Sequence, residues 1–334
     1  MGKITTVGID LAKSVFSVHA IDENGAVLIR KTVSRARLMA MVGQWPACVI
    51  GMEACSGAHE WARRFQGLGH TARIMAARLV APYRMSGKND GNDAEAICEA
   101  VGRPSMRFVP VKSAEQQAIL SLHRVRQGFV EERTATVNRI RGLLAEFGFV
   151  LPNRVVEVRR GAARAAESLP PLARHAIGDL VEHLRALDAR ITAYERELEH
   201  LAHSNEAAER LMTINGVGPM TALATVASVG SAHEFINGRQ FAAWLGLVPR
   251  QWSTGGKTRL GHITKRGDAY LRTLLILGAR AVLQMAAKRD DKLSRWALAV
   301  KARCGYHKAV VAIAAKNARI IWALLARGTT FRAA

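Results

Sequence analysis

The sequence has little of what marks secreted, membrane-spanning or disulfide-bonded proteins. Its 334 residues include four cysteines, Cys48, Cys55, Cys98 and Cys304, and none of them forms a CxxC pair. This usage fits a reducing cytosol and argues against both a zinc module and a disulfide scaffold. No apolar stretch approaches the ~20 residues that a membrane span requires, and the N-terminus lacks the apolar core of a secretory signal. We therefore expect a cytoplasmic protein that binds no membrane.

Acidic side chains are scarce in the last third of the chain. The net charge is +21, and residues 206–334 carry 20 Lys and Arg against six Asp and Glu. No acid occurs between residues 235 and 267, or from residue 292 to the end. Surface of one sign attracts polyanions and makes their binding salt-dependent through counterion release. A solvated cationic face is the plainer alternative, but such faces usually mix both signs, so the charge favours a nucleic-acid partner.

The first 110 residues alternate β-rich runs with helical patterns, which predicts an α/β domain. The expected strands are residues 5–10, 15–21, 26–33, 48–53 and 72–76, and the expected helices are residues 35–45, 58–68 and one that begins near Asp93. Three strands followed by helix, strand, helix, strand and helix describe a mixed sheet with helices packed on it. This order is the pattern of the ribonuclease H-like (RuvC-like) fold.

Residues 111–205 are expected to form a helical, coiled-coil middle. A helix capped by Ser113 would run to Phe147, and a second helix follows Pro170 and Pro171. The second helix carries apolar residues at alternating steps of three and four, namely Ile177, Leu180, Leu184, Leu187, Ile191, Tyr194, Leu198 and Leu201. Such a heptad seam packs against another helix, within the chain or in a second copy. We expect an antiparallel helical pair that also supplies an oligomer contact.

Residues 206–334 are expected to form a basic helical domain that contains a helix-hairpin-helix element. Gly216 and Gly218 lie between two helical patterns, residues 206–212 and 219–228. Two glycines allow a tight hairpin, and Pro219 suits the first position of the next helix. Backbone N–H groups at such a helix start can bind phosphate. An ordinary helix–helix turn is the alternative.

Four carboxylates stand at positions that could hold a metal ion. Asp10 and Glu53 each end an apolar strand, and Asp90 and Asp93 lie three residues apart at a helix start. If the first and fourth strands are neighbours in the sheet, Asp10 and Glu53 face one pocket at its carboxyl edge. Four acids this close need a cation, and oxygen ligands suit Mg²⁺. An Asp at a helix start can instead be a cap, which would account for Asp90 or Asp93 alone.

The segment PRQWSTGGKTR, residues 249–259, combines hydroxyl groups with cations. We expect Ser253 and Thr254 on a flexible loop, close to Arg250, Lys257 and Arg259. Cations beside a hydroxyl can bind a phosphate and stabilise the charge that develops when oxygen attacks it. A plain basic loop that contacts the DNA backbone is the alternative, and the residues alone favour it.

These motifs together resemble the insertion-sequence-110 (IS110) transposases, and their form is closest to the IS1111 subgroup. The resemblance rests on Asp10, Glu53, the motif at residues 88–93, the helix-hairpin-helix and the sequence PRQWSTGGKTRLGHITKRGD, which also contains Lys265 and Arg266. It runs nearly end to end. It implies a RuvC-like domain at residues 1–110, a coiled coil at 111–205 and a transposase domain at 206–334.

The resemblance also implies a chemistry and partners. Asp10, Glu53, Asp90 and Asp93 become ligands of Mg²⁺ or Mn²⁺, and a nucleophilic serine falls in the segment of Ser253, Thr254 and Gly255. Members of the family are guided by a structured bridge RNA and act as dimers that pair into tetramers with shared active sites. In some relatives the serine directly precedes glycine, a position that Thr254 holds here. We expect Ser253 as the nucleophile, because its primary hydroxyl is less crowded than that of β-branched Thr254, the alternative.

The resulting hypothesis is a DNA transposase of the bacterial cytoplasm, at the nucleoid, that exchanges strands through a 5′-phosphoserine intermediate. Gly216, Gly218, Arg250, Lys257, Arg259, Lys265 and Arg266 would bind nucleic acid. The second hypothesis is a Mg²⁺-dependent nuclease that hydrolyses DNA with the carboxylates alone. The third is a non-enzymatic nucleic-acid-binding protein, which leaves the clustered acids hard to explain.

Overall fold

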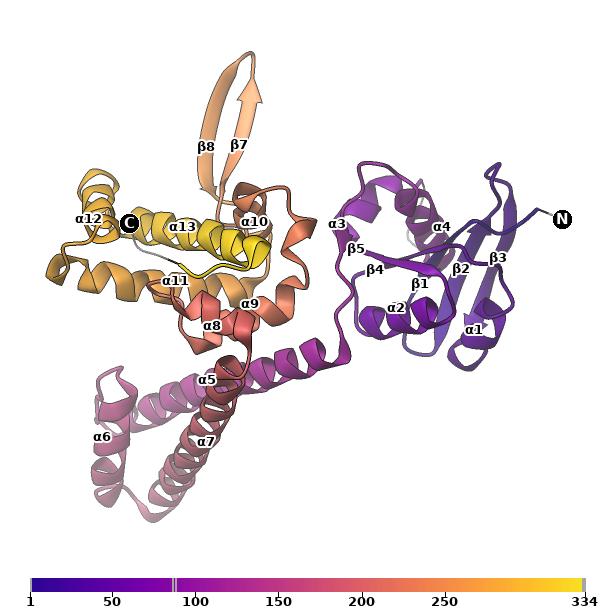
Figure 1. The fold of residues 1–334 in the computed structure, drawn as a ribbon. Coiled ribbons are helices and arrows are strands. Elements are labelled where there is room, and N and C mark those ends of the chain that lie inside the picture. Colours follow the sequence, from indigo (N-terminus) through magenta and orange to yellow (C-terminus); the bar gives the residue numbers. More distant parts are fainter. Residues whose placement is uncertain (1, 86, 88, 332–334) are drawn as a thin grey trace. The chain divides into compact units, whose positions relative to one another are not determined.

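The computed structural model describes residues 2–85, 87 and 89–331, and the chain divides into two compact units. Unit 1 comprises residues 1–116 and unit 2 residues 117–334 (Figure 1). Unit 1 is a mixed α/β sheet domain and unit 2 is mostly helical. The division into three domains at residues 110 and 205 stays a prediction.

Unit 1 is built on a six-stranded sheet with the order β3-β2-β1-β4-β5-β6. The strands are β1 (Thr6–Asp10), β2 (Val15–Ile21), β3 (Val27–Ser34), β4 (Val49–Glu53), β5 (Thr71–Met75) and β6 (Phe108–Val109). β1 pairs antiparallel with β2 and parallel with β4, so the expected mixed sheet is confirmed. The expectation missed β6, because an edge strand of two residues carries no alternation that could predict it.

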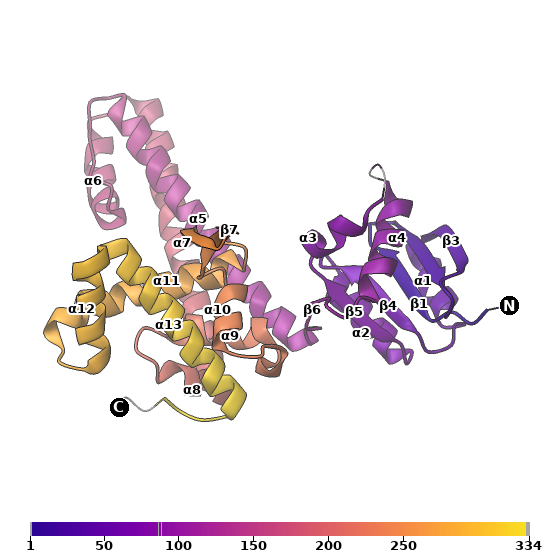
Figure 2. The same cartoon turned by 90° about the horizontal axis from the view of Figure 1, so that it is seen from above.

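Helices cover both faces of this sheet (Figure 2). They are α1 (Arg35–Val42), α2 (Ala58–Gly67), α3 (Ala77–Val80), the 3₁₀ turn η1 (Ala81–Tyr83) and α4 (Asp90–Val101). Buried side chains of α1 and α2 share one core with Val7, Ile9, Ile50 and Met52. Because side chains alternate along a strand, Gly8 and Gly51 point to the opposite face, where α4 packs. The expected start near Asp93 is corrected to Asp90.

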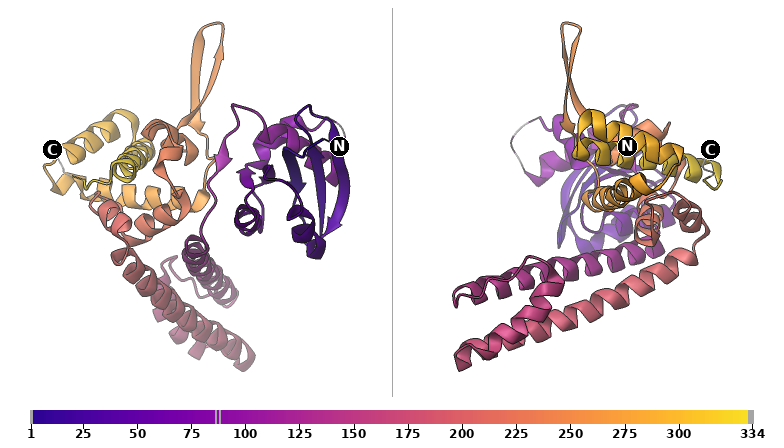
Figure 3. Two further views of the ribbon diagram at one scale, coloured as in Figure 1. Left: turned by 45° about the vertical axis from the view of Figure 1, so that its right-hand side comes forward. Right: turned by 90° about the vertical axis from the view of Figure 1, so that its left-hand side faces the viewer.

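Long helices open unit 2 and form an antiparallel pair. They are α5 (Ala114–Ala145) and α7 (Pro171–His203), and they run side by side in Figure 3. A hydrogen-bonded ion pair joins Arg126 to Glu195, and the carboxylate of Asp188 lies 3.5 Å from Arg133. The predicted pair is thus confirmed, and Ile177, Leu184, Leu187, Ile191 and Leu198 of the seam are buried within the chain.

The first of these helices begins with the predicted cap. The Ser113 hydroxyl accepts a hydrogen bond from the Gln116 N–H at 3.0 Å, and the Gln116 side chain accepts one from the Ser113 N–H at 2.9 Å. This reciprocal arrangement satisfies two backbone donors that a helix start leaves unpaired. The helix ends at Ala145 rather than Phe147. A further helix, α6 (Val155–Glu167), was not expected; its buried side chains are Val158 and three alanines.

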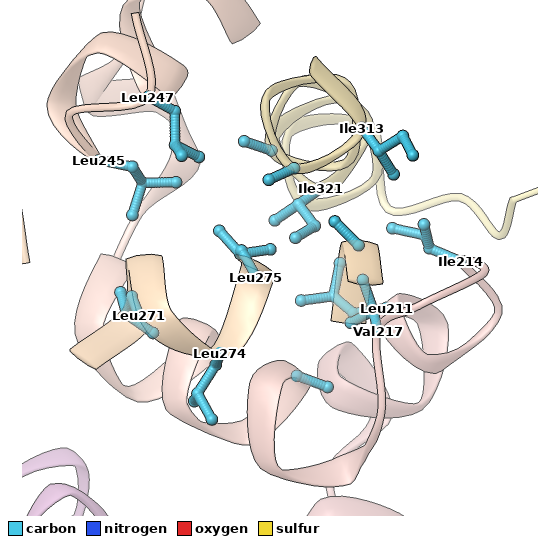
Figure 4. Packing of buried hydrophobic residues seen from close by; sticks show 14 of the residues in the cluster. Leu211, Ile214, Val217, Leu245, Leu247, Leu271, Leu274, Leu275, Ile313 and Ile321 are labelled. Atoms are coloured by element: carbon cyan, nitrogen blue, oxygen red, sulfur yellow. The ribbon is translucent and has the colours of Figure 1, made fainter. Parts of the chain in front are cut away.

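The rest of unit 2 packs around one apolar core. Its helices are α8 (Glu206–Met212), α9 (Pro219–Val229), α10 (Gly238–Trp244), α11 (Ala269–Met285), α12 (Lys292–Cys304) and α13 (Tyr306–Arg327), with 3₁₀ turns η2 (Ala232–Glu234) and η3 (Ala286–Lys288). Figure 4 shows Leu211, Leu245, Leu275, Ile313 and Ile321 meeting in this core. The helical patterns at residues 206–212 and 219–228 are confirmed.

Two segments of this core correct the expectation that no apolar stretch approaches the length of a membrane span. Ala269–Lys288 and Tyr306–Arg327 are long and apolar enough to cross a membrane by length and composition alone. Scattered basic residues interrupt both segments, so neither forms one continuous apolar run in the sequence. α11 and α13 pack against each other, and their buried side chains belong to the core of unit 2.

The expected flexible loop at residues 249–259 is wrong. These residues belong to an antiparallel hairpin of β7 (Pro249–Thr254) and β8 (Lys257–Ile263), which projects from the helices of unit 2 (Figures 1 and 3). Gly255 and Gly256 form its tip with φ of 57° and 78°. Two successive residues at positive φ match the twist of the flanking strands, and glycine adopts that conformation without steric cost.

A carboxylate pocket and a basic hairpin

A pair of glycines brings the carboxylates of unit 1 together. Gly8 of β1 lies opposite Gly51 of β4 in the sheet, and both face α4. A Cβ on Gly8 would stand 2.1 Å from the carbonyl oxygen of Ala94, so α4 rests on bare strand backbone. Asp10 and Glu53 follow two residues later on the same sheet face. Their side chains therefore point toward the start of α4.

The start of α4 supplies the other two carboxylates. The Asn89 side chain caps the helix by accepting a hydrogen bond from the Asn92 N–H at 2.9 Å. Capping therefore does not account for Asp90 or Asp93, which share one side of the first turn. Lys88, which belongs to the motif at residues 88–93, lies outside the described residues.

The four predicted acids line one pocket of about 510 Å³. Its wall comprises Asp10, Glu53, Ala77, Arg78, Ala81, Arg84, Asp90 and Asp93. One carboxylate oxygen from each of Asp10, Asp90 and Asp93 lies within 4.8 Å of the other two. The structure thus joins a strand end and a helix start that are 80 residues apart in the chain.

The electrostatics of the pocket match a cation site. Burial, followed by the charges of Asp93, Asp90 and Glu53, raises the pKa of Asp10 from 3.8 to about 6. The Arg84 guanidinium opposes this rise, and its Nε lies 2.5 Å from a carboxylate oxygen of Asp93. Concentrated negative charge with oxygen donors only is the environment that hard divalent cations prefer. The residues of the pocket therefore fit such an ion.

The hairpin of unit 2 presents two chemically different faces. Paired residues of a ribbon share a face, so Ser253 and Thr258 lie on one side, and Trp252 with Arg259 and Thr254 with Lys257 lie on the other. The Ser253 hydroxyl accepts a hydrogen bond from the Gln251 amide at 3.1 Å, and its oxygen lies 3.4 Å from that of Thr258. The structure thus separates Ser253 from the predicted cations.

The opposite face gathers those cations around Thr254. Trp252, Thr254, Lys257 and Arg259 line a hollow of about 560 Å³. Arg250 lies on this side as well, because a Cβ on Gly261 would stand 2.6 Å from the Trp252 ring and 3.9 Å from the Cβ of Arg250. At the base of the hairpin, Lys265 and Arg266 are exposed, and Lys265 adopts a φ of 53°.

The predicted helix-hairpin-helix turn is tightly packed. Gly216 has a φ of 84°, and a Cβ there would stand 2.8 Å from the carbonyl oxygen of Gly278 on α11. Asn317 of α13 donates a hydrogen bond to the Asn215 carbonyl at 2.9 Å. Gly218 is exposed and precedes Pro219, the first residue of α9. Gly216 therefore has a packing role, and phosphate binding at this turn stays a prediction.

The comparisons with known proteins agree with this architecture. Residues 7–149 match a DEDD transposase family model of the IS110 type, and residues 208–295 match the model described as transposase IS116/IS110/IS902 family. A protein of Pseudomonas aeruginosa described as "Probable family 20 transposase" is 48% identical over 98% of this chain and 99% of its own length. The chain belongs to the IS110 family of insertion-sequence transposases.

Two further relatives place the transposase among named insertion sequences. It is 44% identical to the transposase for insertion sequence element IS1111A of Coxiella burnetii, over 99% of this chain and 92% of the relative. It is 40% identical to the transposase for IS1328 of Yersinia enterocolitica, over 99% of both chains. The transposase is thus an enzyme that acts on DNA, and its first domain is of the DEDD type, which uses divalent metal ions.

Sequence reasoning missed several residues of this transposase's pocket. Arg78 and Arg84 line the pocket, yet no motif indicates them, because Arg78 lies in the short helix α3 and Arg84 directly follows the 3₁₀ turn η1. The glycines offered a signal, since Gly8 and Gly51 each stand two residues before the strand-end acid. Trp252 lies in the segment at residues 249–259, for which the sequence predicts roles of the hydroxyls and cations but none of the indole.

Proposed function

We propose that this transposase cuts and rejoins DNA through a covalent serine–DNA intermediate, with Mg²⁺ or Mn²⁺ held by Asp10, Glu53, Asp90 and Asp93. The observation that carries the proposal is the convergence of these four acids on one pocket. When bound, such an ion stabilises the charge that develops on the phosphate oxygens.

In the proposed first step, Ser253 Oγ attacks the phosphorus of a DNA phosphodiester. The Oγ–P bond forms as the bond from phosphorus to the 3′ oxygen breaks, and the serine proton ends on the departing 3′-hydroxyl. In the second step, a 3′-hydroxyl of another strand attacks the phosphorus of the phosphoserine, the P–Oγ bond breaks as the new P–O3′ bond forms, and the proton of the attacking hydroxyl ends on Ser253 Oγ. One ester is exchanged for another, so rejoining needs no ATP.

The hairpin supports this assignment through local geometry. Ser253 is exposed, and its hydroxyl accepts a hydrogen bond from the Gln251 amide and lies 3.4 Å from the Thr258 hydroxyl. Thr254 is the alternative nucleophile, and it shares its face with Lys257 and Arg259. Its β-branched hydroxyl is the more crowded of the two.

The proposed partners are double-stranded DNA at the element ends and the target, and a structured bridge RNA. Base pairing with the RNA would select the sequence, while Arg250, Lys257, Arg259, Lys265, Arg266 and the turn at Gly216 and Gly218 would hold backbones. The proposed assembly is a homodimer that pairs into a tetramer with shared active sites, in the bacterial cytoplasm at the nucleoid. The family resemblance and the charge of residues 206–334 support these partners.

A covalent adduct tests the proposed nucleophile. The chain is expressed beside its native element, the cells are lysed in denaturant, and protein-linked DNA is compared among the wild type, Ser253→Ala, Thr254→Ala and Thr258→Ala. Thr258→Ala is the matched control, because it removes a hydroxyl from the same face as Ser253. We expect loss of the adduct with Ser253→Ala only. Loss with Thr254→Ala alone would move the nucleophile by one residue.

Hydrolysis by the carboxylate pocket is the second candidate function. It is favoured by one observation: all four acids lie within unit 1, so cleavage by water needs no residue of the hairpin. This mechanism predicts that Ser253→Ala still cuts DNA with Mg²⁺ and that no adduct forms in any variant. Under the serine mechanism, Asp10→Asn and Ser253→Ala both abolish cleavage and leave DNA binding intact.

Sequencing of co-purified nucleic acid tests the bridge RNA. The transposase is purified from cells that carry the native element and from cells that carry its coding region alone. We expect an RNA from the non-coding part of the element in the first preparation only. Equal recovery of unrelated cellular RNA in both preparations would overturn this part of the proposal.

A further inference from the structure

The hairpin of β7 and β8 has no packing role on either face. Every residue of β7 and all but the last of β8 are exposed within the described structure. A two-stranded ribbon in water is marginal by itself, and a partner that covers one face stabilises it. The two faces carry different side chains, so each would bind a different kind of partner.

The face opposite Ser253 combines an aromatic ring with cations. Trp252 is 57% exposed, although indole rings are usually well buried. One side of the ring lies across Gly261, where a Cβ would stand 2.6 Å from the ring carbons. Glycine at this position thus lets the ring lie flat along the ribbon. Lys257 and Arg259 line the same hollow.

We propose that this face binds an unpaired nucleotide of single-stranded DNA, with the base stacked on Trp252 and the neighbouring phosphates on Lys257 and Arg259. A base offers a flat π face only when it is unpaired and unstacked, because neighbouring bases cover both faces in a duplex. A flat exposed indole beside two cations matches one base and its flanking phosphates.

The charge around the hairpin argues for a polyanion rather than a protein surface. No acid occurs between residues 235 and 267, whereas six basic residues do. A second copy of this hairpin would therefore meet it with like charge, which is repulsive. The choice of DNA over RNA rests on the proposed function, since the same hairpin carries the proposed nucleophile Ser253.

Binding measured without chemistry tests this inference. The full chain carries Ser253→Ala, EDTA is present, and fluorescence anisotropy follows binding of an oligothymidine of about 12 nucleotides, within the usual site size of single-strand binders. A duplex and an oligouridine of the same length are measured in parallel. Trp252→Ala is compared with Trp252→Phe, which keeps an aromatic face, and Trp252→Leu, which keeps apolar bulk. Leu260→Ala is the matched control on the opposite face, where Leu260 is 65% exposed.

We expect Trp252→Ala to weaken single-stranded DNA binding by about tenfold or more, the usual effect of losing one stacked base. Trp252→Phe should retain most of the affinity and Trp252→Leu should not. Duplex binding and the Leu260→Ala variant should stay near wild type. A 2-aminopurine in the oligonucleotide should be quenched by the wild type and not by Trp252→Ala. Because Trp252 has no core contacts, the thermal unfolding midpoint should stay unchanged.

Several results would overturn the inference. Equal losses on duplex and single strand would mean a general contact rather than stacking, and equal binding by Trp252→Leu and Trp252→Phe would mean an apolar contact. Tighter binding of oligouridine that depends on Trp252 would assign the face to RNA. A Trp252-dependent dimer with unchanged DNA binding would make it a subunit interface. None of these results depends on Ser253, so failure here and failure of the adduct test are distinguishable.

Discussion

The close packing of α4 against Gly8 leads to a specific prediction about the proposed metal site. In Gly8→Ala, the new Cβ would stand 2.1 Å from the Ala94 carbonyl oxygen and 2.4 Å from the Cys98 amide nitrogen. Both contacts are backbone of one helix, so no side-chain rotation can relieve them. Ordinary contact begins near 3.4 Å, which requires α4 to withdraw from β1 by about 1 Å.

That withdrawal moves two of the four carboxylates away from the other two. Asp90 and Asp93 stand on the first turn of α4, whereas Asp10 and Glu53 stay on the sheet. Mg²⁺ requires its oxygens at about 2.0–2.1 Å, so a displacement of about 1 Å takes ligands out of reach. A misplacement of this size costs about 100-fold in a reaction rate. The overpacking itself should destabilise unit 1 by about 1–3 kcal/mol.

Calorimetry of Mn²⁺ binding to the full chain, with thermal unfolding, checks this prediction. We expect metal affinity and strand cleavage to fall together in Gly8→Ala. Phe65→Leu is the control, because it loosens the core on the opposite face of the sheet without touching α4. Gly51→Ala is the graded companion, since its Cβ would meet the side chain of Val101 at 2.8 Å, at the far end of α4. Wild-type metal affinity in a destabilised Gly8→Ala protein would refute the reasoning.

Four further predictions concern unit 2. Burial lowers the pKa of His123 from 6.5 to about 4, so the unfolded chain takes up the proton first as the pH falls. Lowering the pH from 7.5 to 5 should therefore cost about 2 kcal/mol of stability. Denaturant titrations of the wild type should show this loss, and those of His123→Phe should not. Gly278→Ala should destabilise unit 2 by about 3 kcal/mol, because its Cβ would stand 1.9 Å from the Gly216 carbonyl oxygen. Gly178→Ala, on an exposed helix surface with no atom within 4 Å, should instead stabilise by about 0.5–1 kcal/mol in the same chemical unfolding assay. Lys257→Gln should reduce the slope of log affinity for duplex DNA against log salt by about 0.9, and an unchanged slope would show that this lysine contacts no phosphate.

The sheet and the carboxylate pocket could largely be predicted from the sequence. Strands such as Val49–Glu53 are short apolar runs that end in a polar residue, and this pattern can be recognised from the local sequence alone. Neighbouring parallel strands then bring Asp10 and Glu53 to one edge without further information. Arg84 could not be predicted, because its ion pair with Asp93 depends on how the turn η1 folds back over α4.

The hairpin and α6 were missed for a different reason. The residues of β7 and β8 are exposed on both faces, so no apolar alternation marks them, and Gly255 with Gly256 was the remaining signal. In α6, three of the four buried side chains are alanines, whose hydrophobic contrast with polar neighbours is weak. The face on which Ser253 lies depends on the pairing register of β7 and β8. The sequence predicted a loop, which has no pairing register, so this face could not be predicted.

The absence of core contacts along the hairpin also bears on how this transposase can change over time. Most substitutions destabilise a protein, and stability limits how many a fold can accept. Substitutions between residues 249 and 262 remove no buried side chain, so selection on the proposed nucleic-acid contacts there can proceed without compensating changes in the helices of unit 2. The ribbon is therefore a natural place to introduce altered contacts by directed evolution, with Gly255 and Gly256 kept for the turn and Gly261 kept for the contact with the Trp252 ring.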